Sequence, residues 1–181
     1  MEYITKLEKR VLSWFKTVPG LPVNGRKWLA DNVWWIALVG AILTGMSILQ
    51  SIGSIMTLLA VLNTVVGSYY VTTAGTTLSI VSSLIGIFFM VVSGVLLAVA
   101  VKPLKAKLKK GWVLLFAAWL VSALGVFASA VLSFSIVGFV ITILFGAVWI
   151  VISGYFLFEI HGQFAHVERS AGVKKARLST K

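Results

Sequence analysis

The chain has 181 residues, of which 59% are hydrophobic and only 12% are charged. Soluble domains average about 25% charged residues, so this composition predicts a membrane protein. The chain contains no cysteine, which excludes disulfide bonds, cysteine-ligated metal centres and thiol catalysis. The length suits one domain of a few spanning helices, because each span needs about 20 apolar residues.

The formal net charge of +11 is concentrated in three blocks of sequence. The 16 lysines and arginines all lie in residues 1–32, 101–111 and 162–181, and the long segments between these blocks contain none. Basic residues that flank apolar segments are typical of loops beside a membrane. This placement explains the charge better than nucleic-acid binding, so we expect no nucleic-acid partner.

Residues 1–30 form a basic and amphipathic segment. A helix over residues 3–18 would carry one apolar face, formed by Leu7, Val11, Trp14, Phe15 and Val18. This pattern predicts an N-terminal cytoplasmic amphipathic helix that lies in the membrane interface beside anionic headgroups. A helix packed on a partner protein would show the same pattern and remains the alternative. The segment lacks the form of a cleaved signal peptide.

The first apolar run is too long for one span. It continues for about 30 residues, or about 45 Å of helix, against a hydrocarbon thickness of about 30 Å. We expect Asp31 or Asn32 to cap a first span over residues 33–52, which ends in the polar stretch "QSIGS" at residues 50–54.

An uncharged segment, residues 55–77, would then lie on the far side of the membrane. Its stretch "VVGSYYVTTAGTT", residues 65–77, is rich in β-branched and aromatic residues, which favour a short extended or hairpin piece. Three further spans follow, and only "SFSI" separates the last two, so these two should be antiparallel neighbours. We expect them at residues 78–101, 111–132 and 136–160. The predicted fold is therefore all-α, a four-transmembrane-helix bundle over residues 31–161.

Four spans place all three basic blocks on one side of the membrane. The positive-inside rule makes that side cytoplasmic, so both termini and the basic tail 162–181 should be cytoplasmic. The turn between the two hairpins then carries lysines that are suited to anionic lipid headgroups. The residues expected to contact headgroups are Arg26, Lys27, Lys102, Lys105, Lys107, Lys109 and Lys110.

Small residues recur at a spacing of four in three of the spans. Such residues let helix backbones approach closely inside a membrane. The positions are Gly138, Thr142, Gly146 and Gly154 in the fourth span, Gly94 and Ala98 in the second, and Gly125 and Ser129 in the third. They predict packing within one bundle, and an oligomer interface is the alternative.

The spans contain little that could carry chemistry. Charged residues are absent from their cores, and their serine hydroxyls could line a neutral path but more often bond back to the helix backbone. The strongest polar cluster holds Glu159, His161 and His166, which are weak candidates for metal ligands. We expect Glu159 to pair instead with a lysine of the 102–110 loop. No catalytic motif is present, so we expect neither an enzyme nor a cofactor.

Three stretches carry a resemblance: "LPVNGRKWLADNVWWIALVGAIL", "KLKKGWVLLF" and "ISGYFLFEI". Together they are similar to a family of small four-span bacterial inner-membrane proteins, some of which carry the automatic label chromate transporter. The resemblance implies an amphipathic start, two hairpins joined by a basic turn, and location in the bacterial cytoplasmic membrane. It implies no mechanism.

The sequence therefore favours a non-enzymatic integral membrane protein. Its expected role is structural, lipid-interacting or accessory to a complex, with membrane lipids and either a second copy or another membrane protein as partners. The alternative is a subunit of an oligomeric channel or small-solute transporter, which would need a polar lining built between several copies.

Overall fold

The computed structural model describes residues 20–62, 73–132 and 136–164, which are almost entirely helical. The helices are α2 (Val23–Leu62), α4 (Thr73–Lys105), α5 (Lys109–Val131) and α6 (Ile136–Glu159). One more helical turn, residues 161–164, follows α6. No strand occurs among these residues, so the predicted all-α four-helix bundle is confirmed. The expected helix over residues 3–18 and the tail beyond residue 164 lie outside the described residues.

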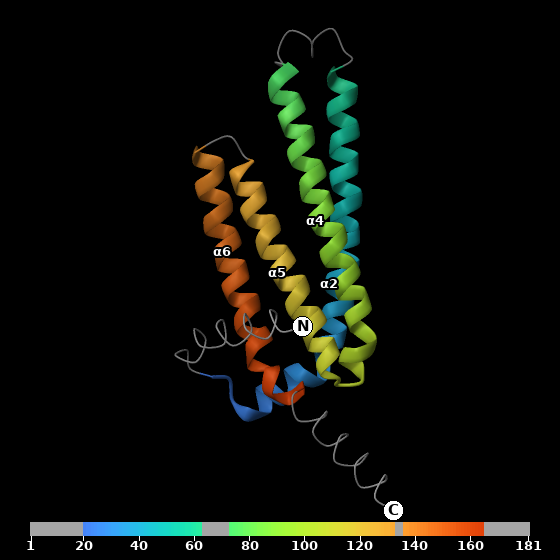
Figure 1. The fold of residues 1–181 in the computed structure, drawn as a ribbon, viewed down its shortest axis with the longest axis vertical. Coiled ribbons are helices and arrows are strands. Elements are labelled where there is room, and N and C mark those ends of the chain that lie inside the picture. Colours follow the sequence, from blue (N-terminus) through green and yellow to red (C-terminus); the bar gives the residue numbers. More distant parts are fainter. Residues whose placement is uncertain (1–19, 63–72, 133–135, 165–181) are drawn as a thin grey trace, which may run out of the picture.

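All four helices are long and apolar enough to cross a membrane. Each packs on the next one along the chain, α2 on α4, α4 on α5 and α5 on α6 (Figure 1). The prediction that the last two spans are neighbours is therefore confirmed. This arrangement makes the chain a multi-pass membrane protein of two helical hairpins.

The first helix is longer than expected, because it does not break at residues 50–54. The serine hydroxyls there bond back to the helix, Ser51 to the carbonyl of Ser47 at 2.8 Å and Ser54 to that of Gln50 at 3.0 Å. Hydroxyls satisfied in this way do not themselves require water. The helix thus continues past the predicted end at residue 52 to residue 62, and residues 73–77 of the stretch expected to be extended are helical instead.

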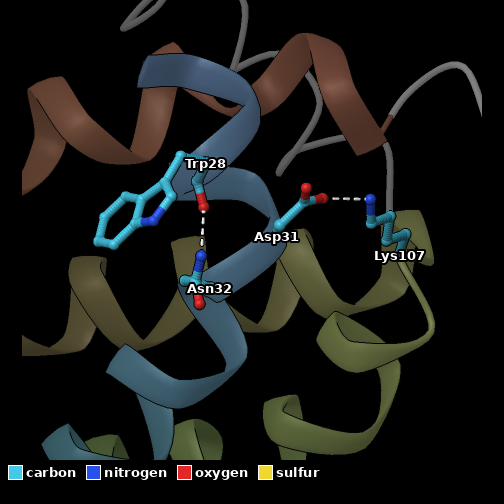
Figure 2. A network of polar contacts seen from close by, with 4 residues as sticks. All are labelled: Trp28, Asp31, Asn32 and Lys107. Carbon is cyan, nitrogen blue, oxygen red and sulfur yellow. Dashed lines mark hydrogen bonds and ion pairs between the residues drawn. The ribbon is translucent and has the colours of Figure 1, made fainter. Parts of the chain in front are cut away.

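The predicted helix caps are also wrong. Helix α2 begins at Val23, so Asp31 and Asn32 lie two turns inside it. Figure 2 shows their actual partners: the side-chain amide of Asn32 donates to the carbonyl of Trp28 at 2.8 Å, and Asp31 pairs with Lys107. Because the turn before residue 31 is helical, neither side chain meets a free helix terminus.

The two hairpins differ in length. Helices α2 and α4 contain 40 and 33 residues, whereas α5 and α6 contain 23 and 24. At 1.5 Å per residue, α4 is about 50 Å long and α5 about 35 Å. The hairpin of α2 and α4 therefore projects well beyond the other, as Figure 1 shows.

Burial is concentrated where the four helices meet, at the start of α2 and α5 and the end of α4 and α6. We call this end the base. Its core is apolar and consists of Ala30, Val33, Ala37, Ala100, Leu104, Trp112, Phe116, Leu157, Phe158, Ile160 and Phe164. Away from the base, large apolar side chains are exposed on all four helices. Such a surface is compatible with hydrocarbon and not with water.

Candidate functional site

Every charged side chain that the structure describes lies at the base. The set comes from the start of α2, the turn between α4 and α5, and the end of α6. It consists of Arg26, Lys27, Asp31, Lys102, Lys105, Lys107, Lys109, Lys110 and Glu159. The expectation that the charged blocks gather on one side therefore holds for the parts of these blocks that are described.

The turn between α4 and α5 has a tight, hydrogen-bonded geometry. Lys107 adopts a left-handed conformation with φ of 54°. Its N–H donates to the carbonyl of Leu104, and the N–H of Leu108 donates to that of Pro103, both at 2.9 Å. These two bonds form a Schellman motif, which satisfies the last carbonyls of α4. The backbone of the turn that carries the lysines thus has a defined geometry.

Gly111 lets the first turn of α5 touch the last turn of α4. A Cβ at residue 111 would lie 2.6 Å from the backbone nitrogen of Leu104 and 2.8 Å from the carbonyl carbon of Pro103. Both are backbone atoms that cannot move aside independently. Only glycine therefore permits this close crossing.

Lys107 forms an ion pair with Asp31 of α2 (Figure 2). Both side chains are partly exposed, so the pair contributes little to stability and mainly fixes where the turn lies against α2. The lysine was expected to bind a headgroup, but its charge is instead compensated within the chain. It also differs from the neighbouring lysines because its left-handed backbone directs it toward α2.

Glu159 joins the end of α6 to the start of α2. Its Oε2 lies 2.6 Å from Nε of Arg26, outside hydrogen-bond alignment, and accepts a hydrogen bond from the backbone N–H of Leu21 at 3.3 Å. The Glu159 side chain is only 12% exposed. The predicted lysine partner is therefore wrong, since α6 ends against α2 and the Lys107 amine already faces Asp31.

Trp112 lies at the centre of the base and is fully buried. Its Nε1–H donates to the carbonyl of Leu157 at 2.9 Å, and its ring stacks on Phe116 and meets the edges of Phe158 and His161. The central position of this tryptophan was not predicted from the sequence. The available signal was the glycine before it, which marks a close backbone approach.

The candidate metal ligands are not brought together. Glu159 pairs with Arg26 and accepts a hydrogen bond from the N–H of Leu21. The centre of the His161 ring lies 4.6 Å from that of the Trp112 ring. No group of three or more potential ligands exists within the described residues. His166 lies outside them. The geometry therefore offers no support for a metal centre.

Five lysines at the base have no acidic partner among the described residues: Lys27, Lys102, Lys105, Lys109 and Lys110. Lys105 places its amine 5.1 Å from the ring centre of Trp34, a cation–π contact. The exposed indoles of Trp28 and Trp35 lie on the same segment of α2. Basic and aromatic side chains at one level are typical of a membrane–water interface.

Most of the predicted small residues face a neighbouring helix. Positions 94 and 125 would bring a Cβ to 3.2 Å from Thr44 and 3.0 Å from Phe89, and residue 146 lies directly against Val126. Gly154 is buried, and Gly138, Thr142 and Ser129 are half-buried. Ala98 is exposed, so it does not pack on a helix within the described bundle. The row on α6 therefore packs on α5 of the same chain.

Compared with known proteins, the chain matches no family model, no curated protein and no solved structure. The resemblance to small four-span proteins stays a prediction.

Proposed function

We propose that this is a non-enzymatic integral membrane protein whose base binds anionic lipid headgroups. One observation carries the proposal: two of the seven described basic residues are paired with the two described acids, and five lysines are left without an acidic partner. Each basic residue near an anionic leaflet contributes about 1 kcal/mol to lipid attraction. The five lysines therefore form a site for headgroup phosphates.

The arrangement of the lysines supports this proposal. Lys102 and Lys105 lie on the last turn of α4, and Lys109 and Lys110 on the first turn of α5, with a Schellman motif between them. Their apolar stems can lie along the helices while the amines reach the headgroup layer. The ion pair of Lys107 with Asp31 places this turn against α2, and the pair of Arg26 with Glu159 joins α2 to α6.

The basic side would be cytoplasmic in a bacterial inner membrane, with both termini inside. The support is the positive-inside rule, because no Lys or Arg occurs between residues 33 and 101 or between 111 and 168. The channel or transporter alternative lacks a matching observation: the hydroxyls of Ser47, Ser51, Ser54 and Thr57 bond to their own helix.

The test compares bound lipids by native mass spectrometry. Protein in detergent is exposed to equal amounts of phosphatidylglycerol and phosphatidylethanolamine. The wild type should retain the anionic lipid in preference, and a variant with Lys102, Lys105, Lys109 and Lys110 replaced by glutamine should lose that preference. The control variant, Asp31→Asn with Lys107→Gln, keeps the net charge and should retain it. A wild type without preference, or a fourfold variant that keeps it, would refute the proposal.

A further inference from the structure

Helix α2 has one buried face and one unpartnered face. Ala30, Val33 and Ala37 are buried in the base, and Thr44 meets Gly94 of α4 on the same side. On the opposite side, exposed residues recur at alternating spacings of four and three. We call this set the α2 seam: Val39, Leu43, Met46, Gln50, Gly53 and Thr57. The spacing is that of a left-handed helix pair, in membranes as in coiled coils.

Gln50 is the member of the α2 seam that requires a partner. The hydroxyls of Ser47, Ser51, Ser54 and Thr57 all donate to a carbonyl four residues earlier. The Gln50 backbone carbonyl accepts one of these bonds, but its side-chain amide makes no hydrogen bond within the described chain. An amide left unpaired in hydrocarbon is strongly unfavourable.

Close contacts between helices show how deep Gln50 lies. Residue 94 is level with Thr44, and Gly125 is level with Phe89. Because α2 and α4 are antiparallel, Phe89 is level with residue 49. Gln50 is thus level with Val126, five residues or about 7.5 Å short of the end of α5 at Val131. It lies within the thickness that α5 spans.

The Cα–Cβ bond of Gln50 leans away from the far surface. Every Cα–Cβ bond in a helix tilts toward the helix N-terminus. The N-terminus of α2 is at the base, so this bond leans toward the membrane interior. Apolar residues precede and follow it on the exposed face, Met46 and Leu49 before it and Met56 and Leu59 after it. Large apolar side chains therefore flank the amide on both sides along the helix.

We propose that the α2 seam binds the α2 seam of a second copy of this chain. A carboxamide is both donor and acceptor, so two copies of Gln50 satisfy one another across a two-fold axis normal to the membrane. Both copies then keep the same orientation in the bilayer. At Gly53, one turn further, a Cβ would meet nothing within 4 Å, so the backbones can approach there. A polar residue at one such position also sets the register.

The first test is oxidative cross-linking in native membranes. The natural chain contains no cysteine, so single-cysteine variants report one position each. Met46→Cys, on the α2 seam, should yield a cross-linked dimer of this chain. Ile52→Cys is the matched control, because Ile52 is exposed on α2 but off the seam, and it should yield far less. Equal yields, or cross-linking of Met46→Cys to a different protein only, would overturn the proposal.

The second test isolates the amide. Gln50→Leu should weaken dimerisation by about three- to twentyfold, the range expected for one interhelical hydrogen bond in a membrane. Dimerisation is measured by fluorescence energy transfer between labelled copies in phosphatidylcholine vesicles. Ser54→Ala, which removes a hydroxyl already bonded to its own helix, should dimerise as the wild type does. An unchanged Gln50→Leu variant would refute the role of the amide. The fourfold lysine variant should still dimerise, so this inference and lipid binding can fail separately.

Discussion

At the start of α5, the absence of a side chain at residue 111 determines how closely two helices approach. The backbone of Leu104 and Pro103 occupies the space that a Cβ would need. This close approach brings Trp112 into the base, where its indole N–H reaches the carbonyl of Leu157. One glycine therefore positions both the lysine turn and the aromatic core.

Gly111→Ala should destabilise the protein. Overpacking against backbone atoms that cannot shift independently typically lowers the free energy of unfolding by about 1–3 kcal/mol. The measurement is the thermal unfolding midpoint in detergent, followed by size-exclusion chromatography.

The matched control is Gly86→Ala on α4. A Cβ at residue 86 would meet nothing within 4 Å, and alanine favours a helix over glycine by up to about 1 kcal/mol. This variant should unfold at the wild-type temperature or slightly above. Equal midpoints for the two variants would mean that the close crossing at residue 111 contributes nothing.

Among the elements, pairs of helices meet through small residues that face larger ones. Gly146 of α6 lies against Val126 of α5, and Gly125 of α5 lies against Phe89 of α4. The spacing of four residues between small side chains predicted that these positions face a neighbouring helix, because this spacing can be read from the sequence alone. It could not distinguish Ala98, which is exposed, since spacing does not specify which side of a helix meets a neighbour.

Gly146→Ala should separate α5 from α6, because the new methyl group would overlap the side chain of Val126. We expect a loss of about 1–3 kcal/mol in the free energy of unfolding. Adding Val126→Ala should restore part of that loss by making room.

The readout is a double-mutant cycle on the unfolding free energies of the two single variants and the pair. A favourable coupling energy between the sites is the expected result. Additive effects would show that Gly146 and Val126 do not touch in the folded protein.

For the whole molecule, composition and charge were sufficient to predict four spans with their charged ends together. The predicted helix boundaries were wrong in α2. Polar residues at positions 50–54 suggested that the helix breaks there, but their hydroxyls bond to the helix itself and no break occurs. The ion pairs of the base were beyond prediction as well. They join Arg26 to Glu159 and Lys107 to Asp31, residues brought together only by helix packing.

Orientation in the membrane is testable with the cysteine-free chain. A single cysteine in place of Ala106, in the lysine turn, should not react with a membrane-impermeant thiol reagent applied to intact cells. A cysteine in place of Ser68, in the uncharged stretch between α2 and α4, should react. Labelling of both variants after lysis is the control for reactivity. The opposite pattern in intact cells would reverse the proposed topology.

The unequal hairpins have a consequence for the bilayer itself. A membrane that fits the 23-residue span of α5 leaves the 28-residue span of α4 about 7.5 Å too long. An apolar helix with this hydrophobic mismatch is accommodated by tilting or by local thickening of the bilayer, at fractions of a kcal/mol per Å. Because one base joins both hairpins, tilt of the longer hairpin also changes the tilt of α5 and α6 relative to the bilayer normal. The tilt of the whole bundle is therefore coupled to the thickness of the bilayer.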